Sequence, residues 1–500
     1  MIKGKNIVGY SESALGSTTF KTFNPKENVA NDAIIFEATA EEIDRACNLA
    51  SKAFKIYRNT PGIKRAAFLN AIADEILALG NNLLDCYVLE SGLPKGRAEG
   101  ERERTIGQLR MFAKLVETED WREPSHKSEG GSTKKMLIPI GPIAVFGASN
   151  FPLAYSTAGG DTASALAAGN PVIVKSHPMH AQTGELIASA IVNAAHKTGM
   201  PEGVFSNLNS NGIEVGTQLV LNPNIKAVGF TGSLNGGRAL YDLAATREEP
   251  IPVFAEMGSI NPVVITQKAL QTRTPEIANM YADSITMGVG QFCTNPGLII
   301  VLESDLTNSF VELLGEKLAK IPSFCMLHPN IHREYTSNKN LLSSQETVIL
   351  VNEAEPPTKT NAAQARLVMT KGSSFLKNIT LHQEVFGPFS MVVQYKDEDQ
   401  LIRIIEKIEG QLTGTIIAEK SDYANISPVF EALQERVGRV VFNGVPTGVE
   451  VCDAMTHGGP YPASSDSRFT AVGPNAIRRW VRPISYQNVP EILLPEILRG

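Results

Sequence analysis

Cysteine is scarce in this chain, which has five cysteines among 500 residues. Their number is odd and no two of them form a Cys-x-x-Cys pair, so the sequence argues against a disulfide framework and against a cysteine-based zinc site. We therefore expect reduced thiols and no metal. The five positions are Cys47, Cys86, Cys293, Cys325 and Cys452.

Long apolar runs and an excess of basic residues are also missing. No stretch of about 18 or more apolar residues occurs, and the first residues contain no apolar segment that ends in a signal-peptide cleavage site. The formal net charge is −6, and the lysines and arginines are scattered, which argues against a surface for nucleic acid or membrane. These absences predict a cytoplasmic protein whose partner is a small molecule.

The composition is that of a globular protein with a large core. Hydrophobic residues make up 43% of the chain and charged residues 20%, and the length suits two or three domains. Residues 40–121 carry apolar side chains at helical spacing, interrupted by Pro61-Gly62 and by Gly92-Leu93-Pro94. The polar stretch 122–135 lacks periodicity, so we expect a linker or an exposed hairpin there.

Short apolar runs rich in β-branched residues alternate with helical runs between residues 141 and 233. This alternation predicts right-handed βαβ units and a parallel sheet, which binds ligands at the carboxyl ends of its strands. A second α/β region is expected from Gly258 to about Pro474. The tail beyond it is apolar, β-prone and interrupted by proline, as in an edge strand or an arm that packs on another subunit.

Two stretches of the first α/β region have features of a nucleotide site. In GFTGSLNGGRAL (229–240), Thr231, Gly232 and Ser233 follow a strand and open a helix, where N–H groups can hold a phosphate and Ser233 suits the N-cap. In VIVKSHPMH (172–180), Lys175 ends a β-rich run and could reach ribose hydroxyls or phosphate. A tight βα connection and a solvated lysine are the structural alternatives.

Glu256 and Cys293 stand in contexts unusual for their residue types. Glu256 interrupts the apolar run FAEMGSINPVVI; burial would raise its pKa toward the range of a general base, and a buried ion pair is the alternative. Cys293 lies on a glycine-rich bend, GQFCTNPG, whereas Cys47 and Cys86 occupy apolar helix positions. A thiol near a carboxylate and a nicotinamide is a candidate nucleophile.

These stretches together resemble the aldehyde dehydrogenase superfamily over nearly the whole chain, because six motifs stand in that family's order and approximate spacing. The motifs are SNFPLAYSTAGGDTASALAAGNPVIVKSHP, GFTGS, EMGSINP, GQFCTNPG, QEVFGP and FNGVPTG. The resemblance implies an α/β fold with three parts. These are a Rossmann-type parallel-sheet cofactor domain (1–122 and 143–257), an α/β catalytic domain (258–477) and a small β oligomerisation arm (123–142 and 478–500).

The same resemblance implies roles for individual residues. Cys293 would be the nucleophile and Glu256 the base that activates the hydrolytic water, while the Asn150 amide and the Cys293 backbone N–H would form the oxyanion hole. Glu384 and Phe386 would hold the nicotinamide ribose and ring. The adenosine ribose and the diphosphate would be bound through Lys175, Ser176, His177, Pro178, Thr231, Gly232, Ser233 and Gly237.

The variants GQFCTNPG, EMGSINP and HGGPYPASSDSRFTAVG resemble a subgroup with NADP-linked 2,5-dioxovalerate (α-ketoglutaric semialdehyde) dehydrogenases and an NADP-dependent fatty aldehyde dehydrogenase. The implied reaction is oxidation of 2,5-dioxovalerate to 2-oxoglutarate, by a homodimer or homotetramer. Because Pro178, and not a carboxylate, stands three residues after Lys175, we expect NADP to be preferred, with NAD also possible. Substrate contacts are expected from Arg104, Phe151, His457 and Arg468.

Arg104 is the leading candidate for binding a substrate carboxylate. The family places this position on a helix that lines the substrate entrance, and an arginine can bind a carboxylate through two hydrogen bonds. Arg102 and Arg110 lie at helical spacing from it and are expected to be solvated or ion-paired, because successive helical residues face different ways. A surface arginine is the alternative for Arg104.

Two other functions stay open for the protein. One is a medium- or long-chain fatty aldehyde dehydrogenase, and the other is a catalytically silent family member.

Overall fold

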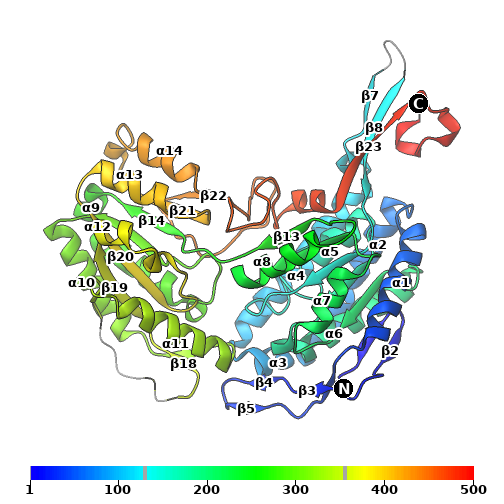
Figure 1. Cartoon of the computed structure of the whole chain (residues 1–500), viewed down its shortest axis with the longest axis horizontal. Helices are drawn as coiled ribbons and strands as arrows, with labels where there is room; N and C mark the ends of the chain where they lie inside the picture. The colour runs from blue at the N-terminus through cyan, green and yellow to red at the C-terminus, as the bar shows by residue number, and fades with distance from the viewer. Residues whose placement is uncertain (1, 128–131, 353–356, 358, 500) are drawn as a thin grey trace.

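The computed structural model describes residues 2–127, 132–352, 357 and 359–499. Two lobes lie side by side, each built on a seven-stranded sheet with helices around it, and a three-stranded arm projects from one lobe (Figure 1). The fold is therefore mixed α/β, as the sequence predicts.

The first lobe contains the predicted strand–helix alternation. Its sheet has the order β13-β12-β9-β10-β11-β1-β2, in which the five strands from β9 to β13 are parallel and β1 and β2 add an antiparallel edge. The strands are β1 (Asn6–Val8), β2 (Ser11–Ser13), β9 (Ile143–Phe146), β10 (Val172–Lys175), β11 (Phe205–Leu208), β12 (Ala227–Thr231) and β13 (Val253–Glu256).

Helices cover both faces of this sheet, because successive strand residues alternate between two apolar cores. Ile143 and Val145 of β9 face the core formed with α2 to α6, whereas Ala144 and Phe146 face the core formed with α1, α7 and α8. The helices are α1 (Ala40–Tyr57), α2 (Gly62–Ala78), α3 (Gly80–Ser91), α4 (Lys95–Glu117), α5 (Gly160–Ala168), α6 (Ala181–Thr198), α7 (Glu214–Leu221) and α8 (Leu234–Ala245). The predicted helical region before residue 121 is confirmed.

The second lobe repeats the same construction. Its sheet has the order β17-β19-β20-β15-β14-β21-β22, and all its pairs are parallel except β17 with β19. The strands are β14 (Pro262–Ile265), β15 (Leu298–Leu302), β17 (Ile349–Leu350), β19 (Arg366–Lys371), β20 (Phe389–Tyr395), β21 (Gln411–Ile417) and β22 (Val437–Phe442). The helices are α9 (Gln267–Thr286), α10 (Asp305–Lys320), α11 (Pro329–Ser343), α12 (Gly372–Lys377), α13 (Glu398–Lys407) and α14 (Ser427–Gln434).

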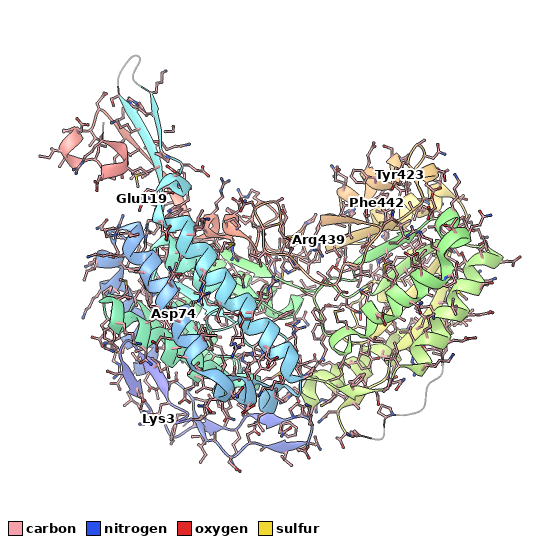
Figure 2. All side chains as sticks on the ribbon, turned by 180° about the vertical axis from the view of Figure 1, so that it is seen from behind. Lys3, Asp74, Glu119, Tyr423, Arg439 and Phe442 are labelled. Atoms are coloured by element: carbon pink, nitrogen blue, oxygen red, sulfur yellow. The ribbon has the colours of Figure 1, made fainter. Side chains whose placement is uncertain are left out.

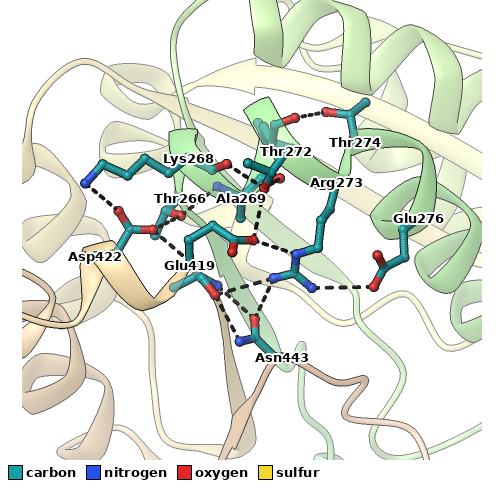
Figure 3. Close-up of polar contacts among 12 residues, drawn as sticks. Thr266, Lys268, Ala269, Thr272, Arg273, Thr274, Glu276, Glu419, Asp422 and Asn443 are labelled. Atoms are coloured by element: carbon teal, nitrogen blue, oxygen red, sulfur yellow. Dashed lines mark hydrogen bonds and ion pairs between the residues drawn. The ribbon is translucent and has the colours of Figure 1, made fainter.

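A polar network holds α9 against the carboxyl ends of β21 and β22 (Figure 3). Pro275 lies inside this helix and Arg273 leaves the helical conformation just before it, which fits the lack of an N–H group on proline. The guanidinium of Arg273 donates to Glu419 at 2.6 Å and to Asn443 at 3.1 Å. Arg273 therefore ties α9 to the segments that follow two neighbouring strands, by an ion pair to one and a hydrogen bond to the other.

The arm is an antiparallel sheet of the order β23-β8-β7, formed by β7 (Ser125–Lys127), β8 (Thr133–Pro139) and β23 (Val481–Gln487). The hairpin and the edge strand predicted from the sequence are thus confirmed, although residues 128–131 of the predicted stretch lie outside the described residues. Beyond β23, Ile492 and Leu493 are 81% and 71% exposed.

The three sheets fall within the three predicted parts of the chain, whose boundaries themselves stay a prediction.

Smaller strand pairs complete the fold. The side chain of Asn361 in the second lobe donates to the Pro25 carbonyl in an N-terminal hairpin at 3.1 Å. In the described part of the chain, no helix is both long and apolar enough to cross a membrane. The minor strands are β3 (Thr19–Phe20), β4 (Phe23–Asn24), β5 (Val29–Ala30), β6 (Ile35–Phe36), β16 (Phe324–Cys325) and β18 (Ala362–Ala363).

Candidate active site

Four predicted site residues lie at one edge of the first sheet. Lys175, Thr231 and Glu256 are the last residues of β10, β12 and β13, and Asn150 follows β9 by four positions. These four strands are neighbours in the order β13-β12-β9-β10, and parallel strands present their carboxyl ends at the same edge. The first sheet therefore gathers the side chains that the motifs single out.

The bend that carries Cys293 is built from unusual backbone conformations. The residues Gly288, Val289 and Gly290 all have positive φ, at 56°, 60° and 64°. A β-branched residue such as Val289 is strained in this region, and such strain is found at functional sites. A Cβ atom at Gly290 would collide with the backbone of Gly387, so glycine allows the QEVFGP loop to approach closely.

Asn261 fixes the backbone of the same bend. Its side-chain amide donates to the carbonyl of Cys293 at 2.9 Å and to that of Asn295 at 2.8 Å. Asn261 precedes β14 and is fully buried. Sequence reasoning did not assign it a role, although it stands in the EMGSINP motif, because nothing local to the motif indicates a contact with a bend some thirty residues later.

The Cys293 thiol is surrounded by one imidazole and two carboxylates. Its Sγ lies 3.6 Å from Nε2 of His457. Burial, helped by the carboxylates of Glu384 and Glu256, raises the pKa of the Cys293 thiol to about 12. Burial and nearby arginines, of which Arg439 has the largest effect, lower the pKa of His457 to about 3. At neutral pH the thiol is therefore protonated and lies beside an uncharged imidazole, whose lowered pKa makes it a weak proton acceptor.

Glu256 is a buried carboxyl group that forms no ion pair with any residue that the structure describes. It is 7% exposed, and its Oε2 atom makes no hydrogen bond to any described residue. Arg479, whose charge acts on the pKa of Glu256, instead binds Asp161 at 2.6 Å. Burial raises the pKa of Glu256 well above its ordinary value. The geometry thus favours the general-base interpretation over the buried ion pair.

Asn150 reaches the segment just before the thiol. Its side-chain amide donates to the carbonyl of Gln291 at 3.0 Å. A primary amide carries two N–H groups, so one remains for an oxygen bound at Cys293. This placement agrees with a contribution to an oxyanion hole, a role that stays a prediction.

A cavity of about 240 Å³ opens onto Cys293. Arg104 lies in its wall: its guanidinium donates to the Val449 carbonyl and, at 3.3 Å, to the Tyr155 hydroxyl, while its Nε is buried and has no partner among the described residues. Other lining residues include Arg97, Glu101, Phe151, Tyr155, Phe292, Thr294 and Val449.

The neighbouring arginines of α4 behave as expected. Arg102 pairs with Glu103 at 3.5 Å and Arg110 pairs with Asp74 at 3.3 Å, so neither is directed to the cavity. Arg104 differs from both because it lines the cavity wall.

Of the predicted substrate residues, Arg468 lies away from the cavity, and the role of His457 stays a prediction. Arg468 does not line this cavity: its side chain is 79% exposed and pairs with Asp466, two residues away, at 2.6 Å. We therefore correct the expectation that Arg468 faces the substrate, because a local ion pair in an exposed turn holds it. His457 is buried beside the thiol and is not among the cavity-lining residues.

Three residues near the thiol were missed by sequence reasoning. Arg97 lies at the cavity wall with its guanidinium carbon over the rings of Phe151 and Phe292, 4.4 and 4.6 Å from their centroids. Tyr155 lines the cavity. Arg439, on β22, lies on the side of the second lobe that faces the first (Figure 2) and acts on the charges of Cys293 and His457. No local pattern indicates any of these long-range contacts.

The predicted phosphate site has the features of a helix N-terminus. Ser233 is the N-cap of α8, and its hydroxyl accepts from Gly236 N at 3.2 Å. The N–H of Gly232 donates to the Glu256 carbonyl and is not available to a ligand. Other first-turn N–H groups of a helix can bind a phosphate. A Cβ atom at Gly237 would lie 2.6 Å from the Met257 sulfur, so glycine here permits close helix–strand packing.

The predicted ribose site centres on Lys175, whose Nζ donates to the Ser210 carbonyl at 3.2 Å. Burial lowers the pKa of Lys175 to about 8. The Ser176 hydroxyl is buried, and Pro178 begins a 3₁₀ turn. His177 stacks on the ring of His180, and burial lowers its pKa well below the ordinary value, so it is uncharged at neutral pH.

Glu384 and Phe386 lie on the QEVFGP loop beside the catalytic bend and line one small cavity with Phe292. A Cβ atom at Gly258 would collide with the Glu384 carboxylate. Glu384 therefore lies against Gly258, which follows Glu256 by two positions in the chain. Burial raises the pKa of Glu384 to about 7.

Comparison with known proteins decides the family. The sequence profile described as "Aldehyde dehydrogenase family" matches residues 12–464. The chain belongs to the aldehyde dehydrogenase family. It is 44% identical to alpha-ketoglutaric semialdehyde dehydrogenase 2 of Azospirillum brasilense, over 100% of this chain and 97% of that protein. It is 42% identical to alpha-ketoglutaric semialdehyde dehydrogenase of Acinetobacter baylyi, over 99% and 96%.

Solved structures of the family share the fold. A betaine aldehyde dehydrogenase of Staphylococcus aureus in complex with NAD⁺ superposes with a TM-score of 0.85 at 18% identity, over 98% of each chain. Methylmalonate-semialdehyde dehydrogenase of Oceanimonas doudoroffii gives a TM-score of 0.82 at 18% identity, over 97% and 98%. The predicted family resemblance and the α/β fold class are confirmed, and the protein is an NAD(P)-dependent aldehyde dehydrogenase.

The residues of this aldehyde dehydrogenase fit a nicotinamide dinucleotide. A capped helix N-terminus is available for the diphosphate, and a lysine at the carboxyl end of β10 is available for the ribose. Glu384 lies close enough to act on the pKa of Cys293, so a nicotinamide ribose held by Glu384 would adjoin the thiol. Among the described residues, no group of His, Cys, Asp or Glu side chains is arranged to hold a metal ion.

Proposed function

We propose that this aldehyde dehydrogenase oxidises 2,5-dioxovalerate to 2-oxoglutarate. The observation that carries the proposal is Arg104, a cation in the wall of the cavity that opens onto Cys293, which has no ion-pair partner among the described residues. An aldehyde with a carboxylate at its other end would give this group a charged hydrogen-bond partner. The two relatives of 44% and 42% identity are named for the same semialdehyde, which supports the substrate class.

The two alternative functions have weaker support. A long alkyl chain in the cavity would leave Arg104 of its wall without an anionic partner, and partly buried charged groups without partners are unfavourable. A catalytically silent protein would be expected to have lost a nucleophile, a base or an oxyanion donor. Cys293, Glu256 and Asn150 are all present and lie around one bend.

The proposed reaction starts at the Cys293 thiol. The thiol loses its proton to solvent, and the sulfur adds to the aldehyde carbon to give a thiohemiacetal. The Asn150 amide and the Cys293 N–H stabilise the oxyanion, and losing one such donor typically raises the barrier by about 3 to 4 kcal/mol. The bound cofactor supplies the hydride acceptor, which leaves an acyl thioester on Cys293. Glu256 then takes a proton from water, and the water adds to the thioester to release the acid and the thiol.

Substitution of Arg104 tests the substrate assignment. Arg104→Ala should raise KM for 2,5-dioxovalerate by roughly 10- to 100-fold, as expected for loss of a charge-assisted contact, and should change KM for pentanal little. Steady-state kinetics on both aldehydes measures the difference. Arg110→Ala is the matched control, because Arg110 lies on the same helix and pairs with Asp74 at the surface.

Two outcomes would count against this assignment. Equal losses of kcat/KM for charged and neutral aldehydes would make Arg104 a structural residue. A wild-type enzyme that prefers dodecanal to 2,5-dioxovalerate would replace the proposal with the fatty aldehyde alternative.

We further propose that NADP is the preferred cofactor and that NAD is accepted. The support is Lys175, a cation at the ribose end of the site, and the absence of a carboxylate in the segment 176–178 that follows it. His177 is uncharged and adds little. We expect kcat/KM for NADP to exceed that for NAD at a saturating aldehyde concentration. A kcat/KM that clearly favours NAD would refute this preference and would leave the aldehyde chemistry unaffected.

A homodimer or homotetramer is proposed from the arm. The sheet β23-β8-β7 projects from the body, and the tail beyond it exposes Ile492 and Leu493 (Figure 1). Light scattering on the intact protein measures the mass, and a monomer would contradict the proposal.

All five cysteines are free, which supports the proposed cytoplasmic location.

A further inference from the structure

Two side chains of opposite charge hold the loop that follows β11. Lys175 Nζ donates to the carbonyl of Ser210 at 3.2 Å. Glu37 Oε1 accepts from the N–H of the next residue, Asn211, at 3.0 Å. The ammonium and the carboxylate thus bind the C=O and the N–H of the same peptide unit, between Ser210 and Asn211, at the carboxyl edge of the first sheet, where the adenosine ribose is proposed to bind.

The position of Glu37 is fixed by its backbone. Its N–H donates to the Thr18 carbonyl at 3.0 Å, and the N–H of Ala38 donates to the carbonyl of Asn209 at 2.9 Å. The next residue, Thr39, is the N-cap of α1 with a complete capping box. These backbone contacts on both sides of Glu37 hold its carboxylate beside the loop.

One oxygen of this carboxylate remains available. Glu37 is partly exposed, and its Oε2 atom has no hydrogen-bond partner in the described part of the chain. Glu37 also acts on the charge of Lys175, since it raises the pKa of that ammonium against the effect of burial. The two groups therefore share one electrostatic environment as well as one loop.

We propose that Glu37 is the residue that discriminates between NAD and NADP in this enzyme, an inference that rests on the proposed ribose site at Lys175. A carboxylate can accept hydrogen bonds from the two ribose hydroxyls of NAD, whereas it repels the 2′-phosphate of NADP. Glu37 therefore favours binding of NAD, whereas Lys175 favours binding of NADP. Sequence reasoning searched for this carboxylate just after Lys175 and missed it, because the fold supplies it from the segment before α1.

A second carboxylate borders the same loop. A Cβ atom at Gly212 would collide with the carboxylate of Glu214, at the start of α7. Glu214 therefore faces Gly212, one residue beyond the peptide that Glu37 binds. If negative charge alone repelled the 2′-phosphate, Glu37 and Glu214 would both contribute. If a carboxylate binds the ribose hydroxyls, we expect it to be Glu37, which binds the same loop as Lys175.

Dissociation constants of NAD and NADP, measured by isothermal calorimetry without aldehyde, test this inference. Glu37→Gln keeps an oxygen that can accept from Asn211 and removes the charge. We expect it to weaken NAD binding and strengthen NADP binding, so that the Kd ratio shifts toward NADP by roughly tenfold or more. Glu41→Gln removes the same charge from the exposed side of α1 and should leave the ratio unchanged.

The outcomes separate this inference from the function on which it rests. An unchanged ratio in Glu37→Gln, or an equal shift in Glu214→Gln, would overturn the assignment of Glu37. If Lys175→Met leaves the affinity for both cofactors unchanged, the ribose site itself is misplaced and the inference fails with it. A wild-type preference for NAD, reversed by Glu37→Gln, would refute the proposed NADP preference and support Glu37 as its cause.

Discussion

Cys293→Ala is expected to lower turnover by about 10⁴-fold or more while the Kd for the cofactor stays near that of the wild type. The substitution removes the atom that bonds to the aldehyde and little else. Asn261 binds the backbone carbonyl of residue 293, so the bend should keep its shape without the sulfur. Turnover is followed by the absorbance of the reduced cofactor, and cofactor affinity by calorimetry.

Cys325→Ala is the matched control for this experiment. Cys325 is a free, partly buried cysteine on β16 and does not line the cavity at Cys293. Its loss should leave turnover unchanged. If purified Cys293→Ala retained a substantial fraction of wild-type turnover, oxidation through a Cys293 thioester would be untenable.

Glu256→Gln is expected to separate the two halves of the reaction. The first turnover should still produce a burst of reduced cofactor, because acylation of Cys293 precedes the step that needs the base. Steady turnover should fall by about 10²- to 10⁴-fold, the usual contribution of a general base. Stopped-flow absorbance resolves the burst from the steady rate.

The pH dependence of the wild-type enzyme should report the same residue. Burial raises the pKa of Glu256, so the carboxyl group becomes protonated at a higher pH than an exposed glutamate and is then unable to act as a base. Deacylation should therefore slow as pH falls through that raised pKa. Equal losses of the burst and the steady rate in Glu256→Gln would instead indicate that Glu256 acts on the thiol or on the structure.

Local sequence patterns predicted the elements that carry the site. The run that ends at Lys175 is β-rich and apolar, so it forms a strand buried among neighbours, and the lysine lies at its carboxyl end. Ser233 follows a strand and precedes helical spacing, and it caps α8 as expected. The glycines around Cys293 indicated a bend, which the positive φ angles explain. In each case the signal and its cause lie within one turn or strand.

Contacts between distant segments could not be predicted in the same way. Asn261 binds the Cys293 bend, Arg439 acts on the pKa of His457, and Glu37 binds the loop after β11. Each of these contacts depends on how two sheets and their connections pack, and no spacing in the sequence encodes it. Arg468 shows the reverse error: its motif suggested the pocket, but Asp466, two residues away, binds it in an exposed turn.

The mass of Glu256→Gln after reaction with NADP and 2,5-dioxovalerate tests the central claim most directly. The aldehyde is predicted to lose a hydride and to stay on the enzyme, because the base that would hydrolyse the thioester is missing. Intact-protein mass spectrometry should show one added acyl group, and fragmentation should place it on Cys293. An unmodified protein that has nonetheless reduced one equivalent of cofactor, or an acyl group on another residue, would contradict the account.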